Sequence, residues 1–285
     1  MTLDIYLSPT LLAMIGLLLG AIIGSFLNVV IYRLPLIMRS EWNNEAKLFL
    51  GMAPDKADNL SLSTPRSHCP DCGTQLKAIH NIPVLSYCFL RGRCSNCSSL
   101  ISIQYPLIEL LSAFLTAYIL ISYGLSDKAL FCLIFTYSLI ALAVIDMREQ
   151  ILPDQITLPL LWLGLILSLF GQWTDPSDAI IGAALGYLSL WSVMQLFKLM
   201  TGKEGMGYGD FKLNAAIGTW LGWQMVPTVI LLSSFLGAVI GLFAIVFLGH
   251  DRRSPFAFGP YLCLAGWVAM QWGDQLSYLF NYLSL

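Results

Sequence analysis

The sequence has few charged residues. Only 11% of its 285 residues are Asp, Glu, Lys or Arg, whereas 57% are hydrophobic and the mean hydropathy is +0.72. A water-soluble domain of this length carries roughly twice that charged fraction. The composition therefore excludes an ordinary soluble domain and indicates a protein that crosses a lipid bilayer several times.

The sequence also lacks a basic excess and a basic N-terminus. The net charge is −2 and the isoelectric point is about 5.9, which argues against a nucleic-acid partner. A cleaved signal peptide begins with positive charge, but the residues before the first apolar run include Asp4 and no Lys or Arg. We therefore expect this run to be a retained span with its N-terminus outside.

Eight apolar runs predict the membrane helices. Seven of them are long enough to cross a bilayer. They lie near residues 10–32, 106–123, 129–146, 156–172, 178–199, 226–248 and 257–273. The eighth, 211–222, is short for a span unless neighbouring helices bury it. The predicted fold class is an all-α polytopic membrane protein of about eight helices.

The distribution of positive charge supports eight crossings. With the N-terminus outside, fourteen of the fifteen Lys and Arg residues fall on one side, and only Lys128 falls on the other. Basic residues accumulate on the cytoplasmic side of membrane proteins. Omitting the short eighth helix would move Arg252 and Arg253 outside. We therefore predict that both termini lie outside and that the long polar loop faces the cytoplasm.

Four of the seven cysteines form two pairs within this loop. The pairs are Cys69-Pro70-Asp71-Cys72 and Cys94-Ser95-Asn96-Cys97. Two C-x2-C turns, each supplying two thiolates, are typical of a tetrahedral zinc site. Gly73 and Gly92 flank the pairs as such turns often require. A reducing cytoplasm favours metal over disulfides, although unliganded or redox-active cysteines remain an alternative.

We interpret this zinc site as structural, because four protein ligands leave no open position for catalysis. A loop with little core of its own would gain folding energy from the metal. Cys88, His68 and His80 are nearby substitutes that we expect to be bystanders, and Cys132 and Cys263 are expected to be small apolar fillers. Residues 36–104 carry seven basic and five acidic side chains, too balanced for binding phosphates.

Two aspartates mark a candidate active site. Asp146 ends the run 139–145, and Asp210 closes Gly205-Met206-Gly207-Tyr208-Gly209 and precedes the short eighth run. The topology above places both at the cytoplasmic edge of the membrane. An ionisable residue there is costly and is a functional candidate by default, although an interfacial helix cap is the alternative for either residue alone.

A pair of carboxylates can hydrolyse a peptide bond. One accepts a proton from the attacking water, and the other, protonated, polarises the scissile carbonyl. Asp210 is expected at the N-cap of its helix, which would make it the base and Asp146 the acid. Gly205, Gly207 and Gly209 are expected to let the backbone turn sharply and a substrate strand approach.

Other acidic residues compete with this pair or support it. Asp154 could replace Asp146, but Leu152-Pro153-Asp154 followed by an apolar run favours a helix cap. Glu109, Glu149 and Glu204 lie near the same predicted face and could contact the catalytic groups.

Motifs along most of the chain resemble those of the type IV prepilin peptidases, a family of bifunctional leader peptidases and N-methyltransferases. Besides the two cysteine pairs, they are Gly24-Ser25-Phe26-Leu27-Asn28-Val29-Val30-Ile31-Tyr32-Arg33-Leu34-Pro35, Tyr105-Pro106-Leu107-Ile108-Glu109-Leu110, Ile145-Asp146, Leu152-Pro153-Asp154, Gly207-Tyr208-Gly209-Asp210 and Pro255-Phe256-Ala257-Phe258-Gly259-Pro260. The separation of 64 positions between Asp146 and Asp210 also resembles the catalytic spacing of this family.

The resemblance implies a bacterial inner-membrane enzyme. It would cut the basic leader from prepilins or pseudopilins on the cytoplasmic side, after a glycine, and then methylate the new N-terminal residue, commonly Phe. The methyl donor would be S-adenosylmethionine, for which no Gly-rich strand-to-helix turn marks a site. The implied domains are a first span at 1–35, a zinc loop at 36–105 and a peptidase core at 106–285.

Three other functions fit part of the pattern. A transporter could carry ions on an intramembrane Asp pair, but its site belongs near the bilayer midplane, in helices related by a repeat that the sequence lacks. A presenilin-like protease shares the Gly-x-Gly-Asp motif but not the cysteine pairs. A membrane scaffold that docks a partner through its zinc loop would tolerate loss of both aspartates. The sequence leaves the oligomeric state open.

Overall fold

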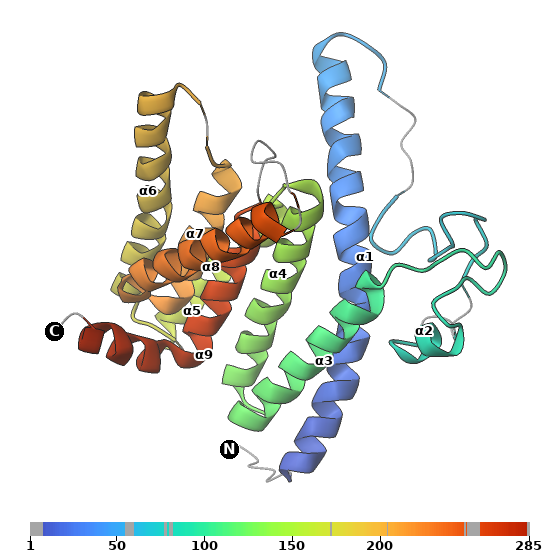
Figure 1. Cartoon of the computed structure of the whole chain (residues 1–285), viewed down its shortest axis with the longest axis horizontal. Helices are drawn as coiled ribbons and strands as arrows, with labels where there is room; N and C mark the ends of the chain where they lie inside the picture. The colour runs from blue at the N-terminus through green and yellow to red at the C-terminus, as the bar shows by residue number, and fades with distance from the viewer. Residues whose placement is uncertain are drawn as a thin grey trace. The chain divides into compact units, whose positions relative to one another are not determined.

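The chain folds into helices joined by short connections and one long loop (Figure 1). The structure is a computed structural model that describes residues 8–54, 60–76, 79, 82–171, 173–203, 205–247, 249 and 257–283. The helices are α1 (Pro9–Phe49), α2 (Leu85–Phe89), α3 (Gln104–Tyr123), α4 (Asp127–Glu149), α5 (Asp154–Leu169), α6 (Pro176–Thr201), α7 (Tyr208–Leu221), the short 3-10 helix η2 (Trp223–Met225), α8 (Val226–Phe247) and α9 (Gly259–Leu283). Within the described ranges there is no strand, only two isolated bridges in the long loop. The all-α prediction is therefore confirmed.

Each of the eight apolar runs forms a helix. Five of the helices are long and apolar enough to cross a membrane by themselves, namely α1, α3, α4, α6 and the η2–α8 segment. Helix α5 is apolar but has 16 residues, and α7 has 14. The integral-membrane class is thus supported by several independent helices, while the count of eight crossings stays a prediction.

Local sequence signals set several helix ends. Pro9 and Pro176 stand in the first turns of α1 and α6, where a missing backbone N–H costs nothing. Ser8 caps α1 by accepting a hydrogen bond from the backbone N–H of Leu11. Gly202 ends α6 in the left-handed conformation that favours glycine. Helix α1 continues through Pro35 to Phe49, so its last turns lie in the stretch predicted to belong to the loop.

The described contacts divide the chain into two compact units, residues 1–141 and 142–285. In the first unit, α3 packs along α1, and the packing depends on glycines four residues apart. A Cβ atom placed on Gly16, Gly20 or Gly24 would lie 2.5–2.8 Å from the backbone of α3. The two helices therefore touch through their backbones, as small residues permit in membrane proteins.

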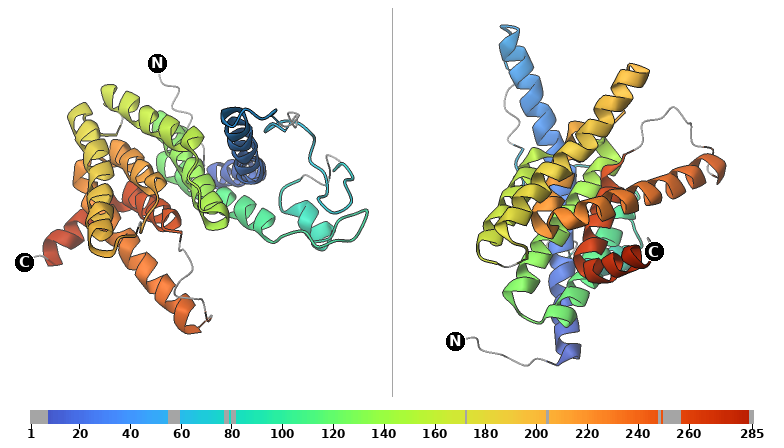
Figure 2. Two further views of the ribbon diagram at one scale, coloured as in Figure 1. Left: turned by 90° about the horizontal axis from the view of Figure 1, so that it is seen from above. Right: turned by 90° about the vertical axis from the view of Figure 1, so that its left-hand side faces the viewer.

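The second unit is organised around the short helix α7, which packs against both α5 and α6. Most of its side chains are buried, and Trp220 donates a hydrogen bond from Nε1 to the carbonyl of Leu160 in α5 at 2.9 Å. The run 211–222 was expected to be too short for a span unless neighbouring helices bury it, and α7 is buried in this way. Helix α8 extends away from the other helices of its unit and has the smallest buried share among the membrane candidates (Figure 2).

We expect Gly20→Ala to loosen the contact between α1 and α3. The added methyl would lie 2.5 Å from the carbonyl oxygen of Ser112 and 2.7 Å from the Cα of Ala113, and backbone cannot move aside cheaply. Overpacking of this kind costs about 1–3 kcal/mol, which thermal unfolding of the detergent-solubilised protein would show as a lower Tm.

Gly237→Ala in α8 is the matched control, because its new methyl would meet nothing nearer than 3.6 Å. Alanine favours a helix over glycine by about 1 kcal/mol, so this variant should keep or raise the Tm. Equal shifts in the two variants would contradict the close-contact account.

Candidate functional site

Asp146 and Asp210 lie at neighbouring helix ends of the second unit. Asp146 is in the last turn of α4 and Asp210 in the first turn of α7. Both are almost fully buried, with exposed fractions of 6% and 8%. Their carboxyl groups are close enough to interact electrostatically, and both interact with the buried thiol of Cys263 in α9. The structure therefore brings the two predicted residues together.

The carboxyl group of Asp146 is held by the start of α9. The backbone N–H of Gly259 donates a hydrogen bond to its Oδ2 at 3.0 Å. A Cβ on Gly259 would lie only 2.7 Å from the same oxygen, so a larger residue would displace the carboxyl group. Gly259 belongs to the quoted motif Pro255–Pro260, but nothing in the sequence had linked it to Asp146.

Asp210 has a less complete set of partners. Its backbone N–H donates to the carbonyl of Gly207 at 3.3 Å. Its Oδ1 is buried, and no described residue forms a hydrogen bond with it. The N-cap of α7 is Gly207, so the expectation that Asp210 is the cap is wrong, because the helix begins at Tyr208. Asp210 still lies in the first turn, where the helix dipole favours negative charge.

The glycines before Asp210 provide space rather than an unusual backbone. None of Gly205, Gly207 and Gly209 has a positive φ, so the predicted sharp turn is not what requires them. A Cβ on Gly209 would lie 2.8 Å from the Cβ of Leu152, and one on Gly205 would lie 2.9 Å from the Phe197 ring. The close approach of these side chains explains two of the three glycines.

Asp154 does not cap α5, contrary to expectation. The N-cap position is Pro153, and Asp154 is the first helical residue. Its two carboxylate oxygens instead accept bonds from the ammonium group of Lys212 at 2.7 and 2.8 Å. Because Lys212 lies two residues after Asp210, this ion pair ties the first turn of α7 to α5. Asp154 thus supports the site without entering it.

The four cysteines of the two pairs converge as predicted. Their Sγ atoms, from Cys69, Cys72, Cys94 and Cys97, all lie within 4.8 Å of one another. The Sγ atoms of Cys69 and Cys97 are 3.8 Å apart. A tetrahedral metal with metal–sulfur bonds of about 2.3 Å requires sulfurs about 3.8 Å apart. The donor set and its spacing therefore fit a metal ion.

The two cysteine turns have the same backbone design. In each, the N–H of the first cysteine donates to a carbonyl five residues later, Thr74 or Ser99, at 3.0 or 2.8 Å. The residue after the second cysteine has a positive φ, and it is Gly73 in one turn and Ser98 in the other. Gly73 therefore serves the turn as expected. The equivalent position in the second turn is a serine, so the sequence did not reveal that its backbone has the same conformation.

The thiol of Cys72 is prepared to bind a metal, because a hydrogen bond with the Thr74 side chain lowers its pKa to about 6. A metal requires the thiolate form, which a lowered pKa supplies at neutral pH. Cys88 and His68 stay outside the sulfur cluster, and His68 Nδ1 contacts the carbonyl of Arg66 instead. His80 lies outside the described residues, as does Glu204.

Two residues of the quoted motifs, Arg33 and Glu109, attach the long loop to the first helix pair, and a third, Asn28, joins α1 to the first turn of α3. The guanidinium group of Arg33 donates to the carbonyls of Ser61 at 2.9 Å and Pro65 at 2.6 Å. Asn28 donates to the carbonyl of Tyr105 at 3.1 Å. Glu109 accepts a bond from the backbone N–H of Val84 at 2.7 Å, so it supports the loop.

Comparison with known proteins gives consistent matches along the chain. Residues 18–123 match the family model described as the bacterial peptidase A24 N-terminal domain, and residues 133–242 match the type IV leader peptidase family. The second match contains both Asp146 and Asp210. No solved structure matches the chain.

Curated relatives match almost end to end. One from Pseudomonas putida is 49% identical over 270 residues, covering 95% of this chain and 94% of the relative. One from Aeromonas hydrophila is 48% identical and covers 96% of each chain, and one from Legionella pneumophila is 44% identical and covers 89% of each. All three are named prepilin leader peptidase/N-methyltransferase.

Proposed function

Because this chain belongs to the type IV leader peptidase family, we propose that Asp146 and Asp210 are the catalytic pair with which it removes the leader from prepilins. The observation that carries this proposal is the convergence of two buried carboxyl groups from residues 64 positions apart. The family is bifunctional, so the enzyme both cleaves prepilins and methylates the product.

The two carboxyl groups divide the chemistry of hydrolysis. One carboxylate takes a proton from a water molecule as its oxygen attacks the scissile carbonyl carbon, and the other carboxyl group donates a hydrogen bond to the carbonyl oxygen. Collapse of the tetrahedral intermediate breaks the C–N bond, and a proton passes to the leaving amine. Two buried like charges that interact repel each other, so we infer that the pair holds one proton between them.

The contacts favour Asp146 as the base. A hydrogen bond from an N–H group stabilises the ionised form of a carboxyl group. Asp146 receives one from Gly259 in another helix, and Asp210 has one from Gly207 at the start of its own helix. The buried Oδ1 of Asp210 has no described donor, which suits the protonated partner. This reverses the assignment expected from the sequence, and it gives the unpartnered Oδ1 of Asp210 more weight than the helix dipole, which favours negative charge in the first turn of α7.

The position of the pair suits a prepilin substrate. We place Asp146, Asp210 and the cysteine loop on the cytoplasmic side of the inner membrane, on the basis that fourteen of fifteen basic residues fall there. A prepilin anchored by its apolar segment would present its leader junction at this depth, with its basic leader residues remaining in the cytoplasm. In this proposal the enzyme cuts after a glycine, and the new N-terminal residue is commonly Phe. Pseudopilins would be cleaved in the same way as prepilins.

The methylation step requires S-adenosylmethionine, which supplies a methyl group to the new N-terminal amine. The described residues form no sheet, so they contain no strand-to-helix turn of the usual cofactor-binding kind. No residue is assigned to this donor. We keep the division into a first span at 1–35, a loop at 36–105 and a peptidase core at 106–285 as part of the proposal.

We further propose that the four-cysteine cluster holds zinc in a structural role. A d10 ion without geometric preference fits a set of four thiolates, and such a closed set leaves no position for a catalytic water. The zinc would provide folding energy to a loop with little core. Among the described residues between the end of α1 and the start of α3, only the ligands Cys69 and Cys94 are buried apolar side chains.

Replacing either aspartate should abolish cleavage. In Asp146→Asn and Asp210→Asn the side chain keeps its size but cannot exchange the proton, so we expect leader cleavage to fall at least about 10²- to 10⁴-fold. Mass spectrometry of a purified prepilin incubated with each variant measures this directly, and added S-adenosylmethionine should shift the wild-type product by one methyl group.

Asp178→Asn is the control for this experiment, because Asp178 is also a carboxylate of the second unit but binds Trp223 and Gln224. It should cleave at close to the wild-type rate. Wild-type cleavage by either Asp146→Asn or Asp210→Asn would refute the proposed pair.

Gly259→Ala should reduce turnover by moving Asp146. The new methyl would lie 2.7 Å from Asp146 Oδ2, so the carboxyl group must leave its bond with the Gly259 N–H. We expect kcat to fall about tenfold or more with a small change in KM, since positioning errors of about 1 Å are costly.

The matched control is Gly266→Ala in the same helix. Its methyl would be equally crowded, at 2.8 Å, but by the Cδ1 atom of Ile217, a flexible side-chain end. If both variants lose kcat equally, general disturbance of α9 and not displacement of Asp146 is the cause.

The cysteine cluster should bind one zinc ion per chain. Cys97→Ser should lose it, whereas Cys88→Ser, which changes an exposed thiol outside the cluster, should retain it. Since the pKa of Cys72 is lowered to about 6, its thiolate is present above that pH and is protonated below it. Because bound zinc stabilises the thiolates further, elemental analysis after dialysis should show zinc retained at neutral pH and released only at a pH below that value.

A further inference from the structure

The segment between the two cysteine turns exposes its apolar side chains. From Ile82 to Leu90 it contains no charged residue, and helix α2 within it has no buried residue. The exposed fractions are 43% for Ile82, 56% for Leu85 and 84% for Phe89. A helix of five residues is not stable by itself in water, and these side chains have no protein core to enter. No described residue covers them.

The contacts of this segment place it beside the membrane span of α1. Glu109 Oε2 accepts the N–H of Val84 at 2.7 Å, and the Cα of Glu109 lies 2.8 Å from where Gly24 would carry a Cβ. Val84 is therefore level with Gly24. Gly24 lies four residues, or about 6 Å, deeper than Asn28, which contacts the first turn of α3.

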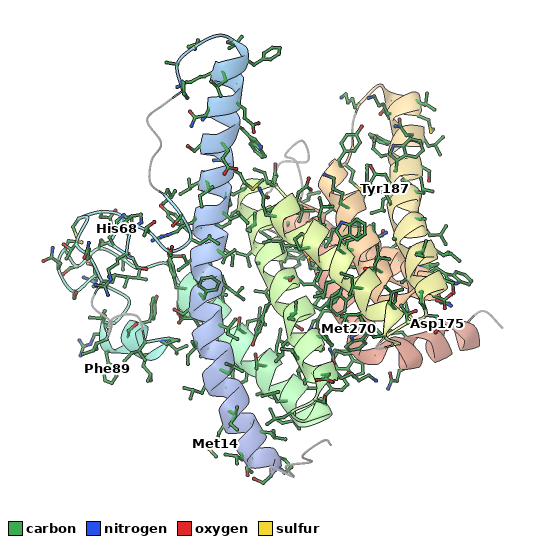
Figure 3. All side chains as sticks on the ribbon, turned by 180° about the vertical axis from the view of Figure 1, so that it is seen from behind. Met14, His68, Phe89, Asp175, Tyr187 and Met270 are labelled. Carbon is green, nitrogen blue, oxygen red and sulfur yellow. The ribbon has the colours of Figure 1, made fainter. Side chains whose placement is uncertain are left out.

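The polar part of the loop lies further out along the same helix. Arg33 binds the carbonyl of Ser61, next to the exposed Ser63, and lies nine residues or about 13 Å beyond Gly24. Figure 3 shows the same order, with Phe89 beside α1 between the heights of His68 and Met14. The apolar segment thus lies level with the part of α1 predicted to span the membrane, while the polar loop residues lie beyond the end of that part.

Much of the backbone of the segment is hydrogen-bonded, which lowers the cost of leaving water, because an N–H group in hydrocarbon needs a partner. The N–H groups of Leu90, Arg91, Gly92 and Arg93 all donate to carbonyls within the segment, at 2.9–3.1 Å. That of Val84 is bound by Glu109. An irregular loop without such bonds could not leave water at an acceptable cost.

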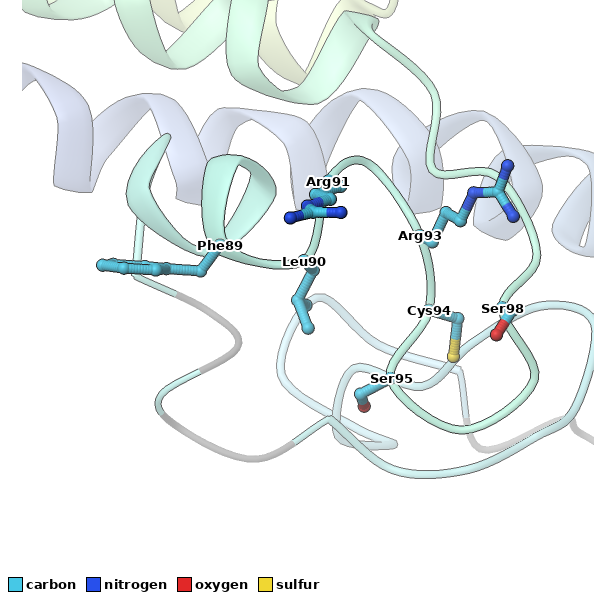
Figure 4. A pocket seen from close by; sticks show the side chains of 7 residues that line it. All are labelled: Phe89, Leu90, Arg91, Arg93, Cys94, Ser95 and Ser98. Carbon is cyan, nitrogen blue, oxygen red and sulfur yellow. The ribbon is translucent and has the colours of Figure 1, made fainter.

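Two arginines follow the apolar residues directly. Arg91 and Arg93 are exposed and line an open depression together with Phe89, Leu90 and the backbone turn at Cys94 (Figure 4). Guanidinium groups bind phosphate oxygens well, and basic residues beside an inserted apolar face are attracted to anionic headgroups. Along the chain the apolar residues come first and the two arginines follow. This order matches that of a lipid leaflet, in which the acyl chains lie inside and the phosphate headgroups lie at the surface.

The apolar surface continues onto a membrane helix. In α3 the side chains of Leu107, Leu111 and Phe114 are 57%, 45% and 61% exposed, and α3 carries Glu109, which holds Val84. A lipid layer that covers the outer face of α3 would therefore reach the neighbouring α2 segment without a break.

We propose that residues 82–93 form a membrane anchor that inserts Ile82, Leu85 and Phe89 into the cytoplasmic leaflet. Arg91 and Arg93 then bind the phosphates of anionic phospholipids in the depression. The partner is the lipid bilayer itself, and the anchor fixes the cysteine loop at the membrane surface in addition to the attachments through Arg33 and Glu109. This goes beyond the proposed peptidase and methylation chemistry and uses none of its residues.

The test places a photoreactive phenylalanine analogue, p-benzoylphenylalanine, at position 89 of the full chain in nanodiscs of phosphatidylethanolamine and phosphatidylglycerol. Phe49 is the matched control, since it is 92% exposed but ends α1 sixteen residues, or about 24 Å, beyond Arg33. After irradiation, mass spectrometry should find lipid adducts at position 89 in at least about fivefold excess over position 49.

Equal lipid yields at the two positions would overturn the anchor. So would adducts at position 89 that form only with an added prepilin, because the surface would then serve a protein substrate. Retained leader cleavage shows that a variant is folded. If the variant at position 89 does not fold, the same photoreactive residue is placed at position 85.

The headgroup contact has a separate readout. Native mass spectrometry should show that Arg91→Gln/Arg93→Gln retains severalfold less phosphatidylglycerol than the wild type. Arg39→Gln/Lys47→Gln, which removes the same charge from the outer part of α1, should retain as much as the wild type. Equal loss in both variants would mean that net charge, and not the depression, attracts the lipid.

Discussion

Removing a carboxylate from water costs several kcal/mol unless other groups replace its hydration. The second unit holds two such groups side by side, and three helix ends meet around them. The last turn of α4 carries Asp146, the first turn of α7 carries Asp210, and the start of α9 supplies the N–H of Gly259. Since only one of the two carboxyl groups receives a backbone N–H bond from another helix, the environment is unequal. That inequality is what a proton-sharing pair needs in order to act as base and acid.

Helix α7 shows how this arrangement is kept rigid. With 14 residues it is short for a bilayer, yet its side chains are buried by α5 and α6 and not by lipid. Asn214, one turn after Asp210, donates to the carbonyl of Gly186 at 2.8 Å, and Lys212 binds Asp154. A helix held by hydrogen bonds on both sides cannot slide, so the depth of Asp210 is fixed by protein contacts and does not depend on bilayer thickness.

Much of this could be predicted from the sequence, because membrane helices and metal turns have strong local signals. Length and hydropathy located every helix of the bundle, and the spacing of the cysteines predicted their convergence. The partners of the catalytic residues were not predictable. Gly259 and Cys263 reach Asp146 only through the tertiary arrangement of α9, more than 110 residues along the chain. Local rules also assigned caps to Asp210 and Asp154, where Gly207 and Pro153 occupy those positions and a distant lysine takes the Asp154 carboxylate.

The cysteine loop faces a different physical problem, because it has almost no core. Its ordering entropy must be offset by a few strong attachments, and the structure distributes them along its length. Arg33 holds the part before the first cysteine turn, Glu109 holds Val84, and the four sulfurs close the chain on both sides of the segment 82–93. A metal bound to the four sulfurs joins the two ends of the segment 82–93. The segment then has fewer conformations before it orders, so less entropy is lost when it does. Metal binding and membrane insertion of the same loop would therefore reinforce each other, since each reduces the cost of the other.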